Sequence, residues 1–226
     1  MLYVLDTANL KEIERAFDLY PMSGVTTNPT IISKENKSFL EILKGIRKII
    51  GNDNMLHVQA IATKAEEIVK EADYLTKNIG GNLYIKIPVT AEGIKAMKML
   101  KEKGIKITAT AILTAQQALM AATAGAEFVA PYVNRIDNIS GDGAGVVAEI
   151  VELFQLNNLD TKVIAASFKN VQQVNNVALT GAQSVTVNAE IMDNLLKHPI
   201  TDSSIEKFTK DWESVYGKGT VTYNAK

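Results

Sequence analysis

The chain has 226 residues, of which 46% are hydrophobic, so it can bury a substantial core in one large domain or two small ones. Its 24 basic and 25 acidic residues nearly cancel, which argues against a nucleic-acid surface or a polybasic membrane patch. It contains no cysteine, which excludes disulfides, thiol nucleophiles and thiolate metal sites and is typical of a cytoplasmic protein.

Short apolar runs alternate with helical patterns along the chain. They predict eight strands, at about Leu2–Asp6, Gly24–Asn28, Leu56–Ala60, Leu83–Pro88, Ile105–Thr110, Phe128–Tyr132, Lys162–Ser167 and Ser184–Asn188. The first run is short and no basic residue precedes it, so we expect no signal peptide. No apolar stretch approaches the ~20 residues that span a bilayer, so we expect no membrane partner.

Capping signals predict where several helices begin and end. A threonine followed three positions later by an acidic or amide residue predicts a capping box, and two such pairs are Thr63 with Glu66 and Thr114 with Gln117. Thr90 predicts the start of a helix over Ala91–Lys103. Three helices end at a glycine that comes just before a strand, namely Gly104, Gly125 and Gly181.

Eight strand–helix units of about 28 residues each predict a compact (β/α)8 barrel, formed as a single domain over residues 1–226. The alternative is a doubly wound open sheet, which predicts a glycine-rich turn after the first strand, where this chain has Asp6–Asn9. The segment Gly141–Gly145 resembles a phosphate loop, but it starts about ten residues past its strand. We therefore interpret it as a flexible loop.

The last part of the chain, from about residue 203 to 226, predicts a helix and tail that the barrel does not require. Ile205, Phe208, Trp212 and Val215 fall at helical spacing. This helix could pack on its own barrel or on a neighbouring subunit, and the sequence leaves both open.

Lys86 is the most informative residue of the sequence, because it interrupts the buried strand Leu83–Pro88. Burial of a charged amine is costly, so a desolvated lysine loses its proton more easily than the usual pKa of ~10.4 implies. A neutral amine can attack a carbonyl to form a Schiff base. The alternative is a lysine that snorkels from the strand end to solvent.

Polar residues lie at the carboxyl ends of all eight predicted strands, where barrel enzymes place their chemistry. Each has a structural explanation: Asp6 could cap a helix, Asn28 could form a turn, Arg135 could be a solvated cation, and Ser167 could satisfy the backbone. The joint occurrence of these residues around a buried lysine favours function. With only His57 and His198 as histidines, a metal site is disfavoured, and we expect both to be structural. We also expect no cofactor, because a Schiff-base lysine supplies the electron sink itself.

Five segments of the chain resemble the transaldolase family, and its small branch, the fructose-6-phosphate aldolases, most of all. They are Leu5–Thr7, Gly24–Thr30, Tyr84–Thr90, Ala130–Arg135 and Ala165–Lys169. The resemblance implies the (β/α)8 fold, a nucleophilic lysine at Lys86, and a sugar phosphate and dihydroxyacetone as ligands. It also implies a homodecamer of two pentameric rings, in which the helix around Trp212 would make subunit contacts.

The resemblance also implies roles for the remaining site residues. Asp6 and Asn28, with Thr27 beside them, would bind hydroxyls of the dihydroxyacetone portion, and Asp6 would act catalytically by handling protons near it. Gln59, Thr110 and Tyr132 would hold a catalytic water and relay protons. Arg135 and Ser167 would receive the phosphate, and arginine is a bidentate phosphate partner on general grounds.

Two positions bear on which branch the chain resembles. Transaldolases carry a glutamate on the third strand and usually a phenylalanine at the end of the sixth, where this chain has Gln59 and Tyr132. A tyrosine hydroxyl can donate and accept a proton through water, as release of dihydroxyacetone requires, and a phenylalanine cannot. The sequence therefore favours an aldolase, with a transaldolase as the alternative.

Overall fold

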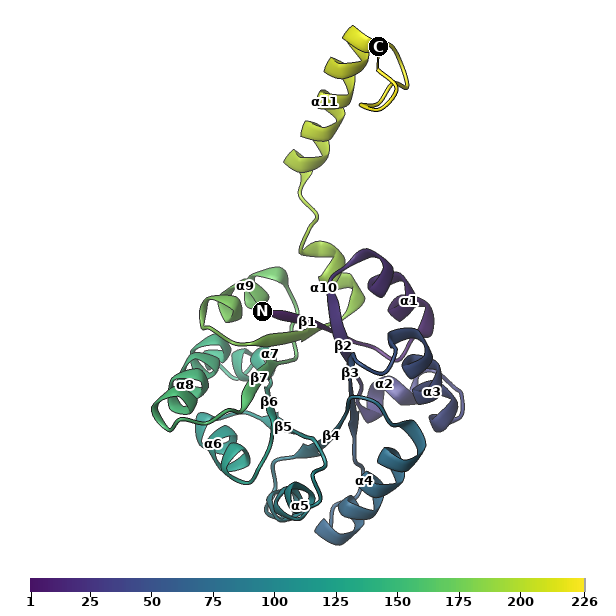
Figure 1. The fold of residues 1–226 in the computed structure, drawn as a ribbon. Helices are drawn as coiled ribbons and strands as arrows, with labels where there is room; N and C mark the ends of the chain where they lie inside the picture. Colours follow the sequence, from purple (N-terminus) through teal and green to yellow (C-terminus); the bar gives the residue numbers. More distant parts are fainter. Residues whose placement is uncertain (226) are drawn as a thin grey trace. The chain divides into compact units, whose positions relative to one another are not determined.

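The computed structural model describes residues 1–225, in which eight parallel strands form a closed barrel (Figure 1). The strands pair in chain order and β8 pairs with β1, which confirms the (β/α)8 barrel. Their bounds differ from the predicted ones by zero to two residues at each end, and they are β1 Leu2–Asp6, β2 Met22–Thr26, β3 Met55–Gln59, β4 Leu83–Pro88, β5 Ile107–Ile112, β6 Phe128–Pro131, β7 Lys162–Ala165 and β8 Ser184–Val187.

Helices follow the strands and surround them (Figure 1). They are α1 Leu10–Leu19, α2 Pro29–Ser33, α3 Phe39–Ile50, α4 Ala65–Ile79, α5 Ala91–Glu102, α6 Ala115–Thr123, α7 Val133–Asp137, α8 Gly143–Leu156, α9 Val171–Leu179, α10 Ala189–Asn194 and α11 Pro199–Tyr216. The short helices α2 and α7 were not predicted. They directly follow β2 and β6, so they form part of the rim of the barrel at the carboxyl ends of these two strands.

The capping predictions have mixed outcomes. Thr90 caps α5, and Thr114 forms the predicted capping box with Gln117. The box at Thr63 was wrong, because α4 begins after Lys64 without a side-chain cap. A neighbouring helix supplies the missing acceptor there, since Glu92 of α5 accepts a hydrogen bond of 2.8 Å from the backbone N–H of Ala65.

The glycine-rich segment Gly141–Gly145 is also different from the prediction. Asp142 caps α8 through a hydrogen bond of 2.9 Å from the N–H of Gly145, so the helix begins at Gly143. An aspartate at an N-cap offsets the low helix propensity of the glycines that follow, because it satisfies an N–H that has no intrahelical partner. Most of this segment is therefore helix rather than loop.

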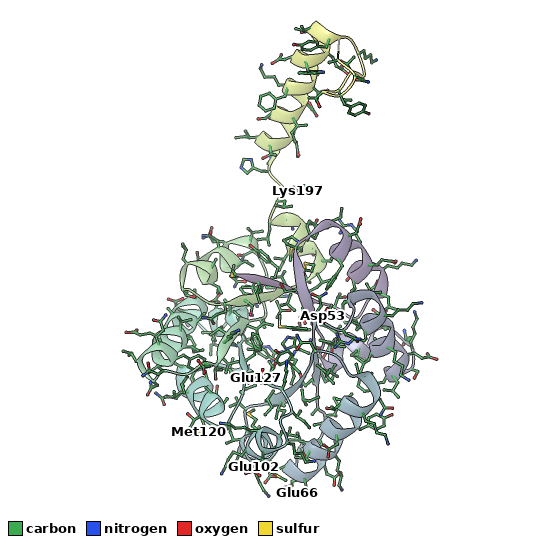
Figure 2. The ribbon with its side chains drawn as sticks, viewed as in Figure 1. Asp53, Glu66, Glu102, Met120, Glu127 and Lys197 are labelled. Carbon is green, nitrogen blue, oxygen red and sulfur yellow. The ribbon has the colours of Figure 1, made fainter. Side chains whose placement is uncertain are left out.

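The barrel interior is apolar at its centre and polar towards one end. Its buried cluster consists of Val4, Met55, Tyr84, Phe128, Ala130, Ile164 and Ala166. Charged side chains such as Glu66 and Glu102 lie on the outside of the helix ring (Figure 2). Gly24 allows close approach of β2 and β3, since a Cβ there would collide with the carbonyl oxygen of Met55.

The chain divides into two compact units, residues 1–192 with the barrel and the part from Asp193 onwards with α11. His198 caps α11 through its ring Nδ1. The ring of Trp212 lies 4.3 Å from that of Tyr216, measured between centroids. None of the residues of α11 is buried, and Ile205, Phe208 and Val215 of the predicted apolar face are exposed.

Candidate active site

A cavity of about 480 Å³ opens at the carboxyl ends of the strands. Most of the predicted site residues line it, namely Asp6, Asn28, Gln59, Lys86, Tyr132, Arg135 and Ser167. They come from β1, β3, β4, the ends of β2, β6 and β7, and α7. The fold therefore gathers residues that lie up to about 160 positions apart in the sequence, as parallel barrels do at this end.

Lys86 lies on β4 with its side chain inside the barrel and is only 6% exposed. Its amine Nζ donates a hydrogen bond of 2.8 Å to the backbone carbonyl of Thr27. Burial lowers the pKa of Lys86 from its ordinary 10.5, and the negative charge of Asp6 opposes this only in part. A fixed amine with a weakened hold on its proton has the properties of a nucleophile.

Asp6 ends β1 and takes part in a chain of hydroxyl groups. Its Oδ1 accepts a hydrogen bond of 2.7 Å from Thr26, whose Oγ1 lies 2.5 Å from that of Thr186. Since Thr26 donates to Asp6, it accepts from Thr186. Burial raises the pKa of Asp6, while Lys86 and Thr26 oppose the shift. Asp6 does not cap α1, because Asn9 does.

Tyr132 lines the cavity, and its hydroxyl lies 3.1 Å from Oγ1 of Thr110, which is buried behind it and does not itself line the cavity. The β5–β6 register shifts between Ala109 and Ile112, and Ala111 adopts a left-handed φ of 59°. This left-handed conformation is strained for an alanine, and strained residues are more frequent at functional sites. Here the irregularity accompanies the entry of Ala111 into the cavity wall.

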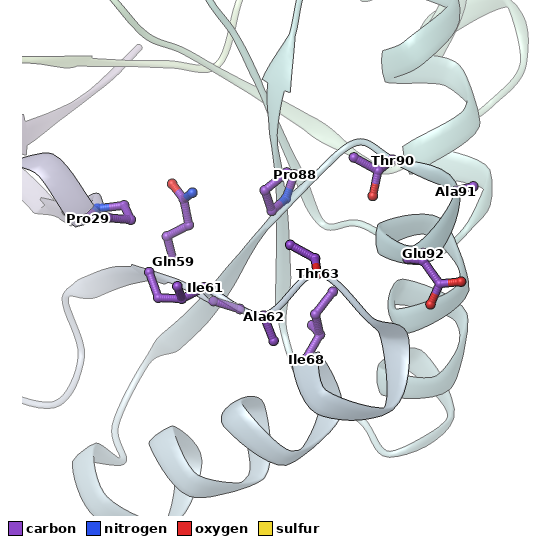
Figure 3. Close-up of a pocket in the computed structure, with 11 residues that line it drawn as sticks. Pro29, Gln59, Ile61, Ala62, Thr63, Ile68, Pro88, Thr90, Ala91 and Glu92 are labelled. Atoms are coloured by element: carbon purple, nitrogen blue, oxygen red, sulfur yellow. The ribbon is translucent and has the colours of Figure 1, made fainter.

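Gln59 reaches the cavity from the other side of Lys86, because its position on β3 is in register with Lys86 on β4. Its side chain projects between Pro29 and Pro88 in the view of Figure 3. Gln59 and Pro29 also line a second, mainly apolar hollow of about 440 Å³ beside the mouth. The predicted group is therefore divided: Gln59 lies on the β3 side of Lys86, whereas Thr110 and Tyr132 lie on the β5 side.

The remaining predicted residues lie around the rim. The guanidinium carbon of Arg135 lies 4.9 Å from the ring centroid of Tyr132, within the range of a cation–π contact. Ser167 adopts a left-handed φ of 64°, and its carbonyl accepts a hydrogen bond of 2.8 Å from the N–H of Asn134. This bond joins the residues that follow β6 and β7 and holds both near the cavity.

Asn28 and Thr27 are used in different ways by the fold. The side-chain oxygen of Asn28 caps α2 by accepting from the N–H of Ile31 at 3.0 Å, which leaves its amide N–H groups for the cavity. The hydroxyl of Thr27 donates to the carbonyl of His57 at 3.1 Å. Thr27 contacts Lys86 through its backbone carbonyl and does not line the cavity.

Besides Thr30 of α2, three threonines on the strands line the cavity without a role assigned from the sequence, namely Thr26, Thr108 and Thr186. They alternate with apolar residues on their strands, and this period of two was the available signal that they point inward. Over residues 1–225 no group of three or more histidine or carboxylate side chains is placed to hold a metal ion. Within the same residues, no helix combines the length and the apolar character that crossing a bilayer requires.

The fold and the cavity together define a (β/α)8 barrel protein with an enclosed lysine amine at the carboxyl ends of its strands. The chain belongs to the Transaldolase/Fructose-6-phosphate aldolase family, whose profile matches residues 3–219. It is therefore an enzyme of the aldolase and transaldolase class, as the five resembling segments predicted.

Curated relatives carry both activities in their names. The chain is 44% identical over 213 residues to a probable transaldolase of Clostridioides difficile, covering 94% of this chain and 97% of the relative. It is 40% identical over 213 residues to a probable fructose-6-phosphate aldolase of Streptococcus pneumoniae, covering 94% and 96%. The two activities share a family, so the names of the relatives do not decide between aldolase and transaldolase. That decision depends on the site residues.

A solved structure of a flavocytochrome b2 variant with sulfite bound has a similar fold. The TM-score is 0.60 at 15% sequence identity, and the match covers 83% of this chain and 56% of that one. At this identity the likeness concerns the barrel alone.

Proposed function

We propose that this protein is a lysine Schiff-base aldolase that reversibly cleaves fructose 6-phosphate to dihydroxyacetone and glyceraldehyde 3-phosphate. The observation that carries the proposal is the enclosed amine of Lys86, held at 2.8 Å by the Thr27 carbonyl in a cavity lined by Asp6, Gln59 and Tyr132. No other residue type on the strand ends can supply an electron sink by condensation with a ketone.

The reaction begins when the amine of Lys86 attacks the C2 ketone of the sugar phosphate. The carbinolamine loses water to give an iminium, whose positive charge draws electrons from the C3–C4 bond. That bond breaks as the C4 hydroxyl loses its proton, and glyceraldehyde 3-phosphate leaves. The remaining enamine takes a proton at C3, and hydrolysis of the iminium releases dihydroxyacetone and restores the amine.

The surrounding residues support these steps by their positions. Asp6, whose pKa burial raises, lies beside Lys86 and exchanges protons with the carbinolamine oxygen. Tyr132 with Thr110, through a water shared with Gln59, handles the proton of the C4 hydroxyl. Asn28 binds a hydroxyl of the donor, and Arg135 with Ser167 binds the phosphate, because the guanidinium and the rim after β7 both face the cavity.

The second candidate is a transaldolase, which keeps the enamine on Lys86 until erythrose 4-phosphate arrives. The names of relatives such as the probable transaldolase of Dictyoglomus turgidum, 45% identical over 215 residues, favour it. Tyr132 and Gln59 favour the aldolase, because the phenol and amide can hold the water that hydrolyses the intermediate.

Two further expectations belong to this proposal. The exposed apolar residues Ile205, Phe208 and Val215 of α11 suit a contact with a neighbouring subunit in a homodecamer. The lack of cysteine suits a cytoplasmic location.

Borohydride reduction in the presence of dihydroxyacetone tests the proposal. We expect a mass increase that peptide mapping places on Lys86, and the loss of both the increase and turnover in Lys86→Met. Lys70→Met, which removes an exposed amine on α4, should retain both. An adduct on another residue, or full turnover in Lys86→Met, contradicts the proposal. Turnover only with erythrose 4-phosphate present supports the transaldolase instead.

A further inference from the structure

His57 is a fully buried residue inside the barrel whose imidazole ring has a hydrogen-bond partner at one nitrogen and none among residues 1–225 at the other. Its side chain is 0% exposed, its ring stacks on Tyr84 with centroids 4.7 Å apart, and Phe128 meets it edge-on at 5.6 Å. Its Nδ1 lies 2.8 Å from Oγ1 of Thr108. Its Nε2 is buried with no hydrogen-bond partner among residues 1–225.

The unpartnered nitrogen indicates which tautomer the ring adopts. If Nε2 carried the proton, an N–H donor would be buried among aromatic rings without an acceptor, and orphaned buried N–H groups are rare and costly. If Nδ1 carries it, the ring donates to Thr108, and only a lone pair of Nε2 stays unsatisfied. The ring is neutral, because burial, helped by the charge of Lys86, lowers the pKa of His57 to about 3. The Nδ1–H tautomer therefore satisfies the site best.

This tautomer decides the role of the Thr108 hydroxyl. Because its oxygen accepts from His57, its own proton is available to a different acceptor. Thr108 is in register with Lys86 on the neighbouring strand and lines the same cavity. The cavity that both residues line, where a substrate attached to Lys86 would lie, offers space for such an acceptor.

We propose that His57 is a positioning residue that holds the Thr108 hydroxyl as a hydrogen-bond donor to an oxygen of the substrate bound at Lys86. The inference rests on the proposed function, since it requires the substrate to reach Lys86. It assigns to Thr108 a contact with the donor portion of the substrate. His57 would orient the Thr108 hydroxyl for that contact without touching the substrate.

Isosteric substitutions test this inference. His57→Phe keeps the ring contacts with Tyr84 and Phe128 but removes Nδ1. Thr108→Val keeps the shape of the side chain but removes the hydroxyl. His57→Asn places an amide N–H near the position of Nδ1 and should restore the bond to Thr108. Ser184→Ala is the control, because Ser184 is another buried hydroxyl of the barrel that donates to the carbonyl of Val163 outside the cavity.

We expect Thr108→Val to lower kcat/KM for fructose 6-phosphate roughly 3- to 10-fold, the value of one neutral hydrogen bond. His57→Phe should lower it by a similar factor without a lower Tm, and the double variant should be no worse than Thr108→Val. His57→Asn should recover most of the loss, and Ser184→Ala should change Tm but not kcat/KM. Unchanged kcat/KM in both single variants, or multiplication of their losses in the double variant, overturns the inference.

Borohydride trapping on the same variants separates this inference from the proposed function. The Lys86 adduct should form in the parent and in every His57 and Thr108 variant, because none of them removes the amine. A parent protein that forms no adduct on Lys86 overturns the Schiff-base proposal, and with it any substrate contact at Thr108. If the adduct forms in all variants but the losses in kcat/KM of the two single variants multiply in the double variant, only the positioning role of His57 is overturned.

Discussion

The amine of Lys86 donates a hydrogen bond to the backbone carbonyl of Thr27, which lies between the end of β2 and the start of α2. The two most specific segments of the family resemblance, Gly24–Thr30 and Tyr84–Thr90, therefore meet at one bond of 2.8 Å. A carbonyl accepts from the amine whether it is charged or neutral. It can thus hold the nitrogen in place without fixing its protonation state.

The first prediction concerns the titration of Lys86. Since burial lowers its pKa, the fraction of neutral amine should rise at a lower pH than for exposed lysines. Competitive labelling with a small acylating reagent over a pH series, read by mass spectrometry, gives a midpoint for each lysine. Lys70 and Lys95 are internal comparisons, because the hydrogen bonds that their amines donate to Glu67 and Glu66 raise their pKa values. A Lys86 midpoint equal to or above theirs would refute the prediction.

Tyr132→Phe should separate cleavage from transfer. The substitution removes the hydroxyl that lies 3.1 Å from Thr110. We expect release of free dihydroxyacetone to fall about 10²-fold, as loss of a positioned acid or base does, while transfer to erythrose 4-phosphate is largely kept. Tyr74→Phe, on the outer helix α4, should change neither rate. Equal losses in both reactions would mean that Tyr132 acts before the two pathways divide.

Arg135→Gln should weaken recognition of the phosphate specifically. Loss of hydrogen bonds to a charged group predicts a rise of roughly 10-fold or more in KM for glyceraldehyde 3-phosphate in the synthetic direction. The KM for unphosphorylated glyceraldehyde should stay nearly constant. Lys98→Gln removes an equal charge from the outer surface of α5 and serves as the control. If both aldehydes are affected alike, the contact of Arg135 with the Tyr132 ring explains the loss better than phosphate binding does.

The barrel could be predicted because its signals are local. Alternating apolar runs and helix-stop glycines depend on neighbouring residues, and Gly104 and Gly125 do adopt the positive φ angles, 68° and 109°, that favour glycine. The error at Thr63 was non-local. The start of α4 is stabilised by Glu92, which lies 27 positions from Ala65, and no pattern around Thr63 could indicate that contact.

The site shows the same division between local and distant signals. Lys86 stands out in the sequence because a charge interrupts an apolar strand. His57 does not stand out, because a histidine in a strand reads as an ordinary core residue. Its link to Thr108 spans 51 positions and depends on the β3–β4–β5 register, which only the folded barrel establishes.

The last prediction concerns the effect of acid on stability. The pKa of His57 is about 3 in the folded protein and 6.5 when unperturbed, so between these values the unfolded chain binds a proton that the folded chain does not. Stability is therefore retained above pH ~6.5 and lost as pH falls, by up to about 1.4 kcal/mol per unit from this residue. His57→Phe and His57→Asn lack the titrating group, so their unfolding free energies should fall less steeply than that of the parent. Urea unfolding at fixed protein concentration between pH 7 and pH 5 measures the slopes, and parallel curves for parent and variants would show that His57 takes up its proton equally in both states.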